Sequence, residues 1–164
     1  MKTLLTKVAQ QEFLNQNRQL TTLQFKWTCR GNGGVTLLDR SDNRLGRASG
    51  TGYDRAGTLL GDFIEDHFQN ELDNLAKRFR NASGGARQVE SSKEFYGLYW
   101  NTCTKVAYVV GSCGFESMRK ILNVIGFEIN CIKESNGRAQ TGVDIYELVP
   151  VGAHNKKYIV TPIK

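Results

Sequence analysis

Arginines near predicted strand ends are the residues of this chain best suited to binding an anion. A guanidinium group holds phosphate or carboxylate through two parallel hydrogen bonds. We expect the arginines between positions 30 and 55 to form a contact surface for nucleic acid or an acidic partner, although the same residues would also serve solubility alone. These arginines are Arg30, Arg40, Arg44, Arg47 and Arg55.

Glycines at two predicted helix starts form a second set of candidate anion ligands. Residues 50–54 (GTGYD) and 112–116 (SCGFE) both place a glycine, an aromatic and an acid before a run with helical spacing. The free N–H groups of a helix N-terminus can receive an anion, which predicts anion-binding turns at Gly50, Gly52 and Gly114. Two other interpretations stay open: tight turns before capped helices, or a duplicated strand–turn–helix unit.

No pattern typical of an enzyme or a metal site accompanies these residues. Neither glycine turn has the Gly-Lys-Ser/Thr of a P-loop or the third glycine of a dinucleotide fingerprint. The four cysteines contain no Cys-x-x-Cys pair, and the only histidines are His67 and His154. We therefore expect no catalytic residue, no metal and no cofactor, and we interpret the cysteines as buried free thiols. An enzyme that uses Cys113 or His67 is the weakest hypothesis.

The composition fits one packed domain with an excess of positive charge. Of 164 residues, 40% are hydrophobic and 23% are charged, which is typical of a soluble globular domain. No apolar run reaches the roughly 20 residues of a transmembrane helix, and we expect a cytoplasmic protein. Lys and Arg number 22 against 16 Asp and Glu. This excess favours nucleic acid, or a complex that contains it, as the partner.

The hydrophobic pattern of the first half predicts a hairpin followed by a long helix. Apolar and polar residues alternate over 23–29, which indicates a strand with Trp27 facing inward, and a glycine-rich turn leads to a second strand over 35–38. A third strand is expected over 43–49, after an opening amphipathic helix over 3–17.

One apolar stripe at helical spacing predicts a single helix over about 54–79, and polar residues 81–92 then predict a loop that divides the chain into two parts. The second half predicts a strand over 105–110 and a shorter helix over about 115–125, closed by Gly126. Strands are also expected over 127–131 and 143–149, and a last short strand ends at Pro162. The predicted class is α+β, a single domain over 1–164 in which antiparallel hairpins of both halves pack against the two helices.

An aromatic cluster opens the second half, and it admits two interpretations. Such side chains stack on unpaired bases when lysine or arginine is close. The same density of aromatics also fills a core, which is the interpretation that we favour. The cluster consists of Phe95, Tyr96, Tyr99, Trp100 and Tyr108.

Two segments are similar to segments of small accessory proteins of bacteriophages and integrated mobile elements. Residues 47–57 (RASGTGYDRAG) resemble one such segment, and residues 111–119 (GSCGFESMR) resemble a second. Proteins of this size and setting include inhibitors of host defence, anti-CRISPR proteins among them. The resemblance implies a non-enzymatic viral or mobile-element protein that binds a host nucleic acid or ribonucleoprotein, such as a CRISPR effector, in the host cytoplasm. It carries over no catalytic residue. The alternative is a protein that binds a phosphorylated or nucleotide signal at the glycine-rich helix starts.

Overall fold

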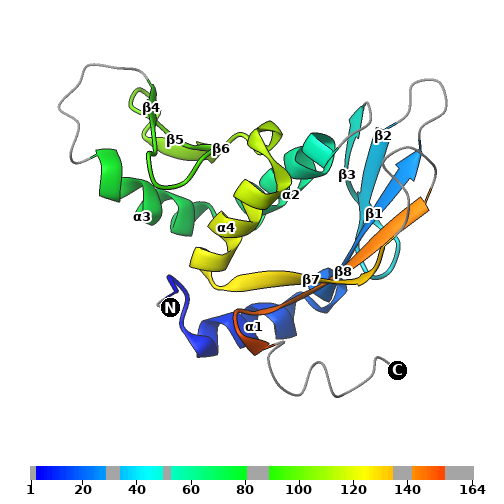
Figure 1. The fold of residues 1–164 in the computed structure, drawn as a ribbon. Helices are drawn as coiled ribbons and strands as arrows, with labels where there is room; N and C mark the ends of the chain where they lie inside the picture. Colours follow the sequence, from blue (N-terminus) through cyan, green and yellow to red (C-terminus); the bar gives the residue numbers. More distant parts are fainter. Residues whose placement is uncertain (1–2, 29–33, 50–52, 81–88, 135–141, 154–164) are drawn as a thin grey trace.

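Two antiparallel sheets flank a layer of helices in the computed structural model, which describes residues 3–28, 34–49, 53–80, 89–134 and 142–153 (Figure 1). This arrangement confirms the predicted α+β class. The helices are α1 (Lys7–Gln16), α2 (Tyr53–His67), α3 (Gln69–Arg80) and α4 (Phe115–Ile125), with short 3₁₀ turns η1 (Arg18–Thr21) and η2 (Gly111–Cys113).

The larger sheet has the strand order β3-β2-β1-β8-β7, and every neighbouring pair is antiparallel. The predicted hairpin and third strand are confirmed, and both parts of the chain contribute strands. Alternation places Phe25 and Trp27 in the core at 1% exposure, beside Leu37 of the next strand. The strands are β1 (Thr22–Thr28), β2 (Gly34–Leu38), β3 (Arg44–Ser49), β7 (Phe127–Lys133) and β8 (Gly142–Pro150).

The smaller sheet has the order β4-β5-β6 and packs on α3 (Figure 1). Its strands are β4 (Val89–Ser91), β5 (Leu98–Asn101) and β6 (Val106–Val109). The prediction of a loop over 81–92 is wrong for residues 89–91, because β4 forms by pairing with β5 and its own three residues carry no recognisable strand pattern. Residues 81–88, and the short strand predicted to end at Pro162, lie outside the described residues.

The single helix predicted over about 54–79 is wrong, because the chain forms α2 and α3 with Phe68 between them. Phe68 is buried, and its ring lies 5.0 Å from that of Phe13 and 5.4 Å from that of Phe127. The break lets one apolar stripe face two sheets: α2 packs against the larger sheet, and α3 packs against the smaller one (Figure 1). The period of the pattern continues through the break, so periodicity could not reveal it.

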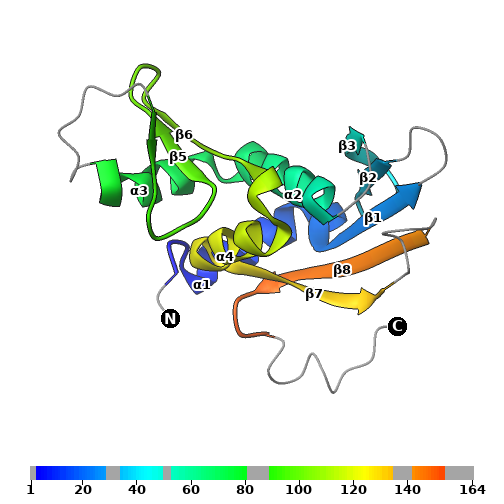
Figure 2. The same ribbon diagram turned by 45° about the horizontal axis from the view of Figure 1, so that its top comes forward.

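Glycines allow α2 to lie against η2 and α4 in the middle of the molecule (Figure 2). A Cβ atom on Gly57 would stand 2.4 Å from the Gly111 carbonyl oxygen, and one on Gly61 would stand 3.2 Å from Met118 Sδ. The helix predicted over about 115–125 is confirmed, and Gly126 closes it with φ of 143°. The opening helix begins only at Lys7, where Thr6 caps it through a hydrogen bond from the Ala9 N–H.

Candidate nucleic-acid interface

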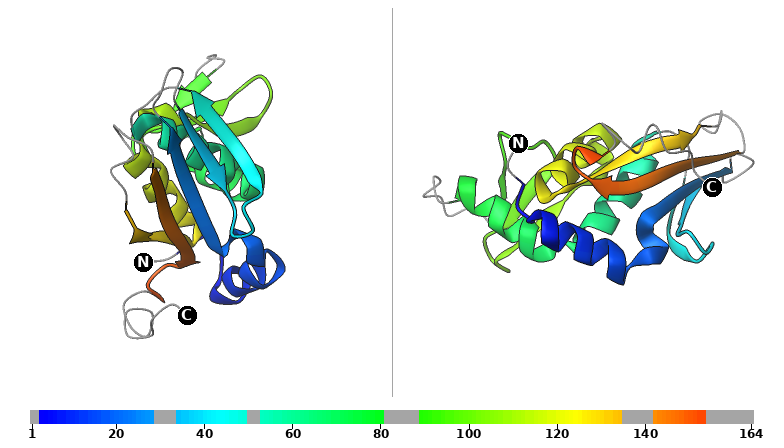
Figure 3. Two further views of the ribbon diagram at one scale, coloured as in Figure 1. Left: turned by 90° about the vertical axis from the view of Figure 1, so that its right-hand side faces the viewer. Right: turned by 90° about the horizontal axis from the view of Figure 1, so that it is seen from below.

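The outward face of the larger sheet carries the polar positions of β1, and the half-buried Leu38, Val143 and Ile145 of β2 and β8 lie beside them. Along β1 the apolar side chains point to α2 and α4, which leaves Gln24, Lys26 and Thr28 on the opposite face. No described helix covers this outward face, as the left view of Figure 3 shows. A sheet with one face packed and one face solvated has this alternation, and its outward residues stand in fixed register.

Strand pairing gathers four basic side chains on this face. In one cross-strand row Arg47 pairs with Thr36, which pairs with Lys26. In the adjacent row Arg44 stands at one sheet edge and Lys133 at the other, joined through paired residues of β2, β1 and β8. Four strand spacings separate those edges, or about 19 Å. We name this set the basic face: Lys26, Arg44, Arg47 and Lys133.

The four cations of the basic face are exposed and make no ion pair with any described residue. The row beyond them pairs Thr22 of β1 with Glu147 of β8, and this carboxylate marks the acidic border of the face. Gln24 lies in the same row as Arg44 and Lys133, and its Nε2 donates to Asp42 Oδ1 at 2.8 Å. The basic face is thus a cationic surface on which strand pairing fixes the rows.

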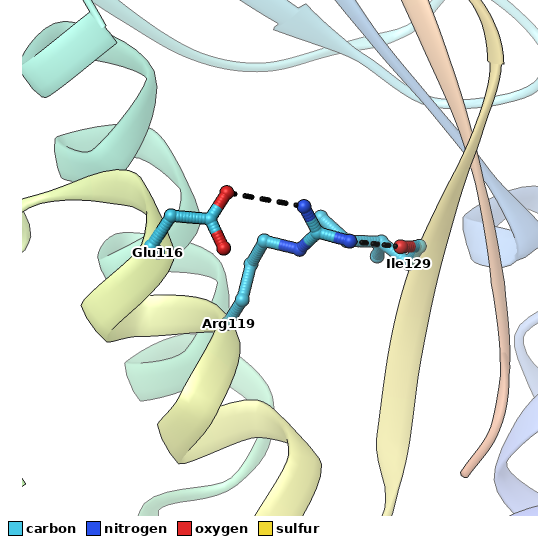
Figure 4. A network of polar contacts seen from close by, with 3 residues as sticks. All are labelled: Glu116, Arg119 and Ile129. Carbon is cyan, nitrogen blue, oxygen red and sulfur yellow. Dashed lines mark hydrogen bonds and ion pairs between the residues drawn. The ribbon is translucent and has the colours of Figure 1, made fainter. Parts of the chain in front are cut away.

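Arg119 is another cation of this region, but its guanidinium already has partners within the protein. Its Nη2 donates to the Ile129 carbonyl at 2.9 Å, and its Nη1 pairs with Glu116 at 3.2 Å (Figure 4). The guanidinium therefore links α4 to the free edge of β7. This contact protects an edge carbonyl from pairing with another chain.

Of the five arginines that the sequence singled out, the structure describes four, and it brings together two of these, Arg44 and Arg47. Arg40 is exposed in the turn after β2, where it lines a groove of about 670 Å³ with Arg18 and Glu147. Arg55 is half-buried on α2, and its Nε has no partner among the described residues. Arg30 lies outside them.

Sequence reasoning missed the other two members of the basic face. The outward position of Lys26 could have been predicted from the sequence, because Lys26 alternates with the inward Phe25 and Trp27. Lys133 could not be predicted to lie on this face, because a register shift between Cys131 and Lys133 decides which face its side chain occupies. A one-residue shift moves a side chain to the other face of a sheet, and no local pattern reports it.

The glycine turn at Gly114 has a clear packing role. Gly114 has φ of 136°, which favours glycine, and its N–H donates to the Gly111 carbonyl at 3.0 Å. The backbone of α2 presses against the same turn, since a Cβ on Gly57 would stand 3.0 Å from the Phe115 nitrogen. Anion binding at Gly114 stays a prediction. Gly50 and Gly52 lie outside the described residues.

Among the described residues, no hydrogen bond joins a cysteine to a histidine. Cys103 and Cys131 are exposed, so the prediction of buried thiols is wrong for both. Cys103 lies in the turn after β5, and Cys131 lies near the end of β7. Desolvation raises the pKa of the Cys131 thiol, which disfavours the nucleophilic thiolate. Desolvation lowers the pKa of His67, whose ring packs 4.8 Å from that of Phe63. Within the described ranges, no group of three or more His, Cys, Asp or Glu residues is arranged to hold a metal.

Among the residues that the structure describes, no helix combines the length and the apolar character needed to cross a bilayer. Comparison with known proteins found no matching family model, no significant match among curated proteins and no significant match among solved structures.

Proposed function

We propose that this protein is a non-enzymatic nucleic-acid-binding protein whose basic face contacts the phosphate backbone. The observation that carries the proposal is the position of Lys26, Arg44, Arg47 and Lys133 on one open face of the larger sheet, without a carboxylate partner among the described residues. Neutralised phosphates release their counterions, so such a surface gains affinity from charge alone and needs no pocket.

The sheet fixes the spacing of the four cations of the basic face. Adjacent strands hold their side chains about 4.8 Å apart, and successive rows on one face lie about 7 Å apart. Flexible lysine and arginine stems can adjust over these spacings to a backbone that passes across the strands. Contacts of this kind carry no sequence information, and we expect binding with little preference for sequence.

The resemblance to accessory proteins of phages makes a host ribonucleoprotein, such as a CRISPR effector, the first partner to test. An acidic RNA backbone that is exposed on such a complex offers the same chemistry as free nucleic acid. Capture from a host lysate with and without nuclease distinguishes the two. A protein partner that survives nuclease favours the ribonucleoprotein, and loss of all captured material favours free nucleic acid.

The decisive experiment removes the charge of the basic face without changing its shape. The variant Lys26→Gln, Arg44→Gln, Arg47→Gln, Lys133→Gln is titrated against a fluorescent oligonucleotide from low to moderate salt. The slope of log K against log salt is negative, and each lost phosphate contact reduces its magnitude by about 0.7 to 0.9, so the magnitude falls by roughly 3.

A matched control removes four exposed cations from helices on other faces: Lys7→Gln, Lys77→Gln, Arg78→Gln and Lys120→Gln. Both variants have the same net charge, so long-range attraction is equal. The proposal fails if the two variants bind alike, or if the parent protein binds no nucleic acid.

A further inference from the structure

The outward face of the smaller sheet has a different character. Alternation along β5 and β6 buries Leu98, Trp100 and Ala107 against the helices. The intervening tyrosines, Tyr99 and Tyr108, lie on the other side of the sheet. We name the outward set the aromatic face: Val89, Ser91, Tyr99, Asn101, Val106 and Tyr108, with Tyr96 in the turn before β5.

Two rings of this face are held parallel. Tyr99 and Tyr108 are a cross-strand pair, with ring centroids 5.4 Å apart and planes within 14° of each other. Desolvation, and then the neighbouring Tyr99, raise the pKa of Tyr108. Tyr96 is 68% exposed, and Val106 is 41% exposed. Exposed apolar side chains and an ordered aromatic pair thus occur on one surface.

The helices hold this sheet from the opposite side and from one edge. Glu65 and Asp73 accept hydrogen bonds from the N–H groups of Val109 and Ala107, at 2.8 and 2.9 Å, and Gln69 donates to the Ala107 carbonyl at 2.8 Å. These side chains recur every four residues along α2 and α3, and they satisfy the free edge of β6. The sheet is therefore a fixed support, and no described helix or strand covers its aromatic face (Figures 1 and 2).

The charge around the aromatic face suits a polyanion. Lys93 lies in the turn between β4 and β5, and Lys105 lies in the turn between β5 and β6, so an exposed ammonium stands at each end of the strands. No outward position of the three strands holds a carboxylate, since Glu90 faces inward at 6% exposure. Glu94, in the first turn, is the acidic residue at the border.

We propose that the aromatic face is a stacking platform for the unpaired bases of single-stranded nucleic acid. This inference rests on the proposed function and names its substrate class. Every base has a flat π surface, so planar rings at the surface bind bases with little preference for sequence, while the terminal lysines contact phosphates. A duplex keeps its bases stacked on one another and cannot use such a platform. The protein should therefore prefer single strands, although its basic face accepts either form.

The test replaces the rings by side chains of similar area that lack a π surface. The variant Tyr99→Leu, Tyr108→Leu is compared with Tyr99→Phe, Tyr108→Phe, which keeps the rings. We expect the leucine variant to lose roughly tenfold or more in affinity for a short oligothymidine. Its affinity for a duplex and its salt slope should stay unchanged, because no charge is lost. The phenylalanine variant should bind as the parent does, and thermal unfolding of both variants checks the fold.

The outcomes separate this inference from the proposed function. If the glutamine variant of the basic face reduces the magnitude of the salt slope while the leucine variant binds oligothymidine normally, the stacking platform is refuted and the proposed function stands. If the leucine variant instead changes the oligomeric state or the capture of a protein, the face is a protein interface and the inference is overturned. A fluorescent base analogue, 2-aminopurine, within the oligonucleotide provides a direct readout. Its emission should change on binding to the parent and not on binding to the leucine variant.

Discussion

Replacing Gly111 with alanine perturbs a close backbone contact between α2 and the second half of the chain. A Cβ atom at this position would stand 2.1 Å from the Gly57 carbonyl oxygen, 2.4 Å from Thr58 Cα and 2.5 Å from the Gly57 carbonyl carbon. All three atoms belong to the backbone of α2. No side-chain rotation can relieve the overlap, so α2 must move by more than an ångström to restore ordinary contact.

The expected cost follows from that displacement. One extra methyl group in a well-packed core costs about 1–3 kcal/mol when side chains can adjust. Here the neighbours are backbone, which places the loss of unfolding free energy at about 3 kcal/mol or more. For a chain of this length, each kcal/mol lowers Tm by about 2–4 °C. We therefore expect Tm to fall by roughly 6–12 °C.

Thermal unfolding followed by circular dichroism, together with urea titration, measures this loss. Gly46→Ala is the control, because a Cβ there would meet only the flexible Leu59 side chain, at 3.1 Å. We expect the control to unfold within about 1 kcal/mol of the parent protein. If Gly111→Ala is as stable as Gly46→Ala, the close approach of α2 to Gly111 is wrong, and so is the packing role assigned to this turn.

Three further predictions concern polar groups of the fold. Asp144→Ala removes the acceptor that lies 2.8 Å from the buried Trp27 indole nitrogen and should cost about 1–3 kcal/mol in urea unfolding; Asp144→Asn keeps an acceptor and should cost less. Desolvation, and then the charge of Asp66, raise the pKa of Asp62 above its ordinary value of 3.8. Ionised Asp62 therefore lowers the free energy of unfolding at neutral pH, and this loss disappears as the pH falls toward 3.8. Asp62→Asn should therefore raise Tm at neutral pH, with a gain that shrinks in acid; a gain independent of pH would contradict the assignment. Arg119→Ala removes the donor to a carbonyl of β7 and should cost about 1–2 kcal/mol, whereas an unchanged urea midpoint would show that water replaces it.

Local patterns predicted those elements whose residues alternate or repeat on one face. The strand that carries Phe25 and Trp27, the helix that ends at Gly126 and the α+β class all follow from period and capping. Short strands such as β4 could not be predicted in this way, because three residues contain too little period to recognise. The break at Phe68 could not be predicted either, because the helical spacing of apolar residues continues from α2 into α3 without interruption.

The candidate sites depend on pairing more than on composition. The sequence identified Arg44 and Arg47 as exposed cations and grouped them with neighbours in the chain, such as Arg40. In the structure, Arg40 lines a separate groove, and the two arginines share their face with Lys26 and Lys133. Proximity along a chain does not report which face of a sheet a residue occupies, because that depends on register.

The sequence by itself determined which segments are apolar on one side, where glycine permits turns and that the chain carries net positive charge. These properties depend on single residues and their near neighbours. Only the tertiary structure decided which strands share a sheet, which cations share a face and that Tyr99 lies against Tyr108. Such arrangements depend on contacts between residues far apart in the chain, and burial of a common core selects one of many pairings that the same local patterns allow.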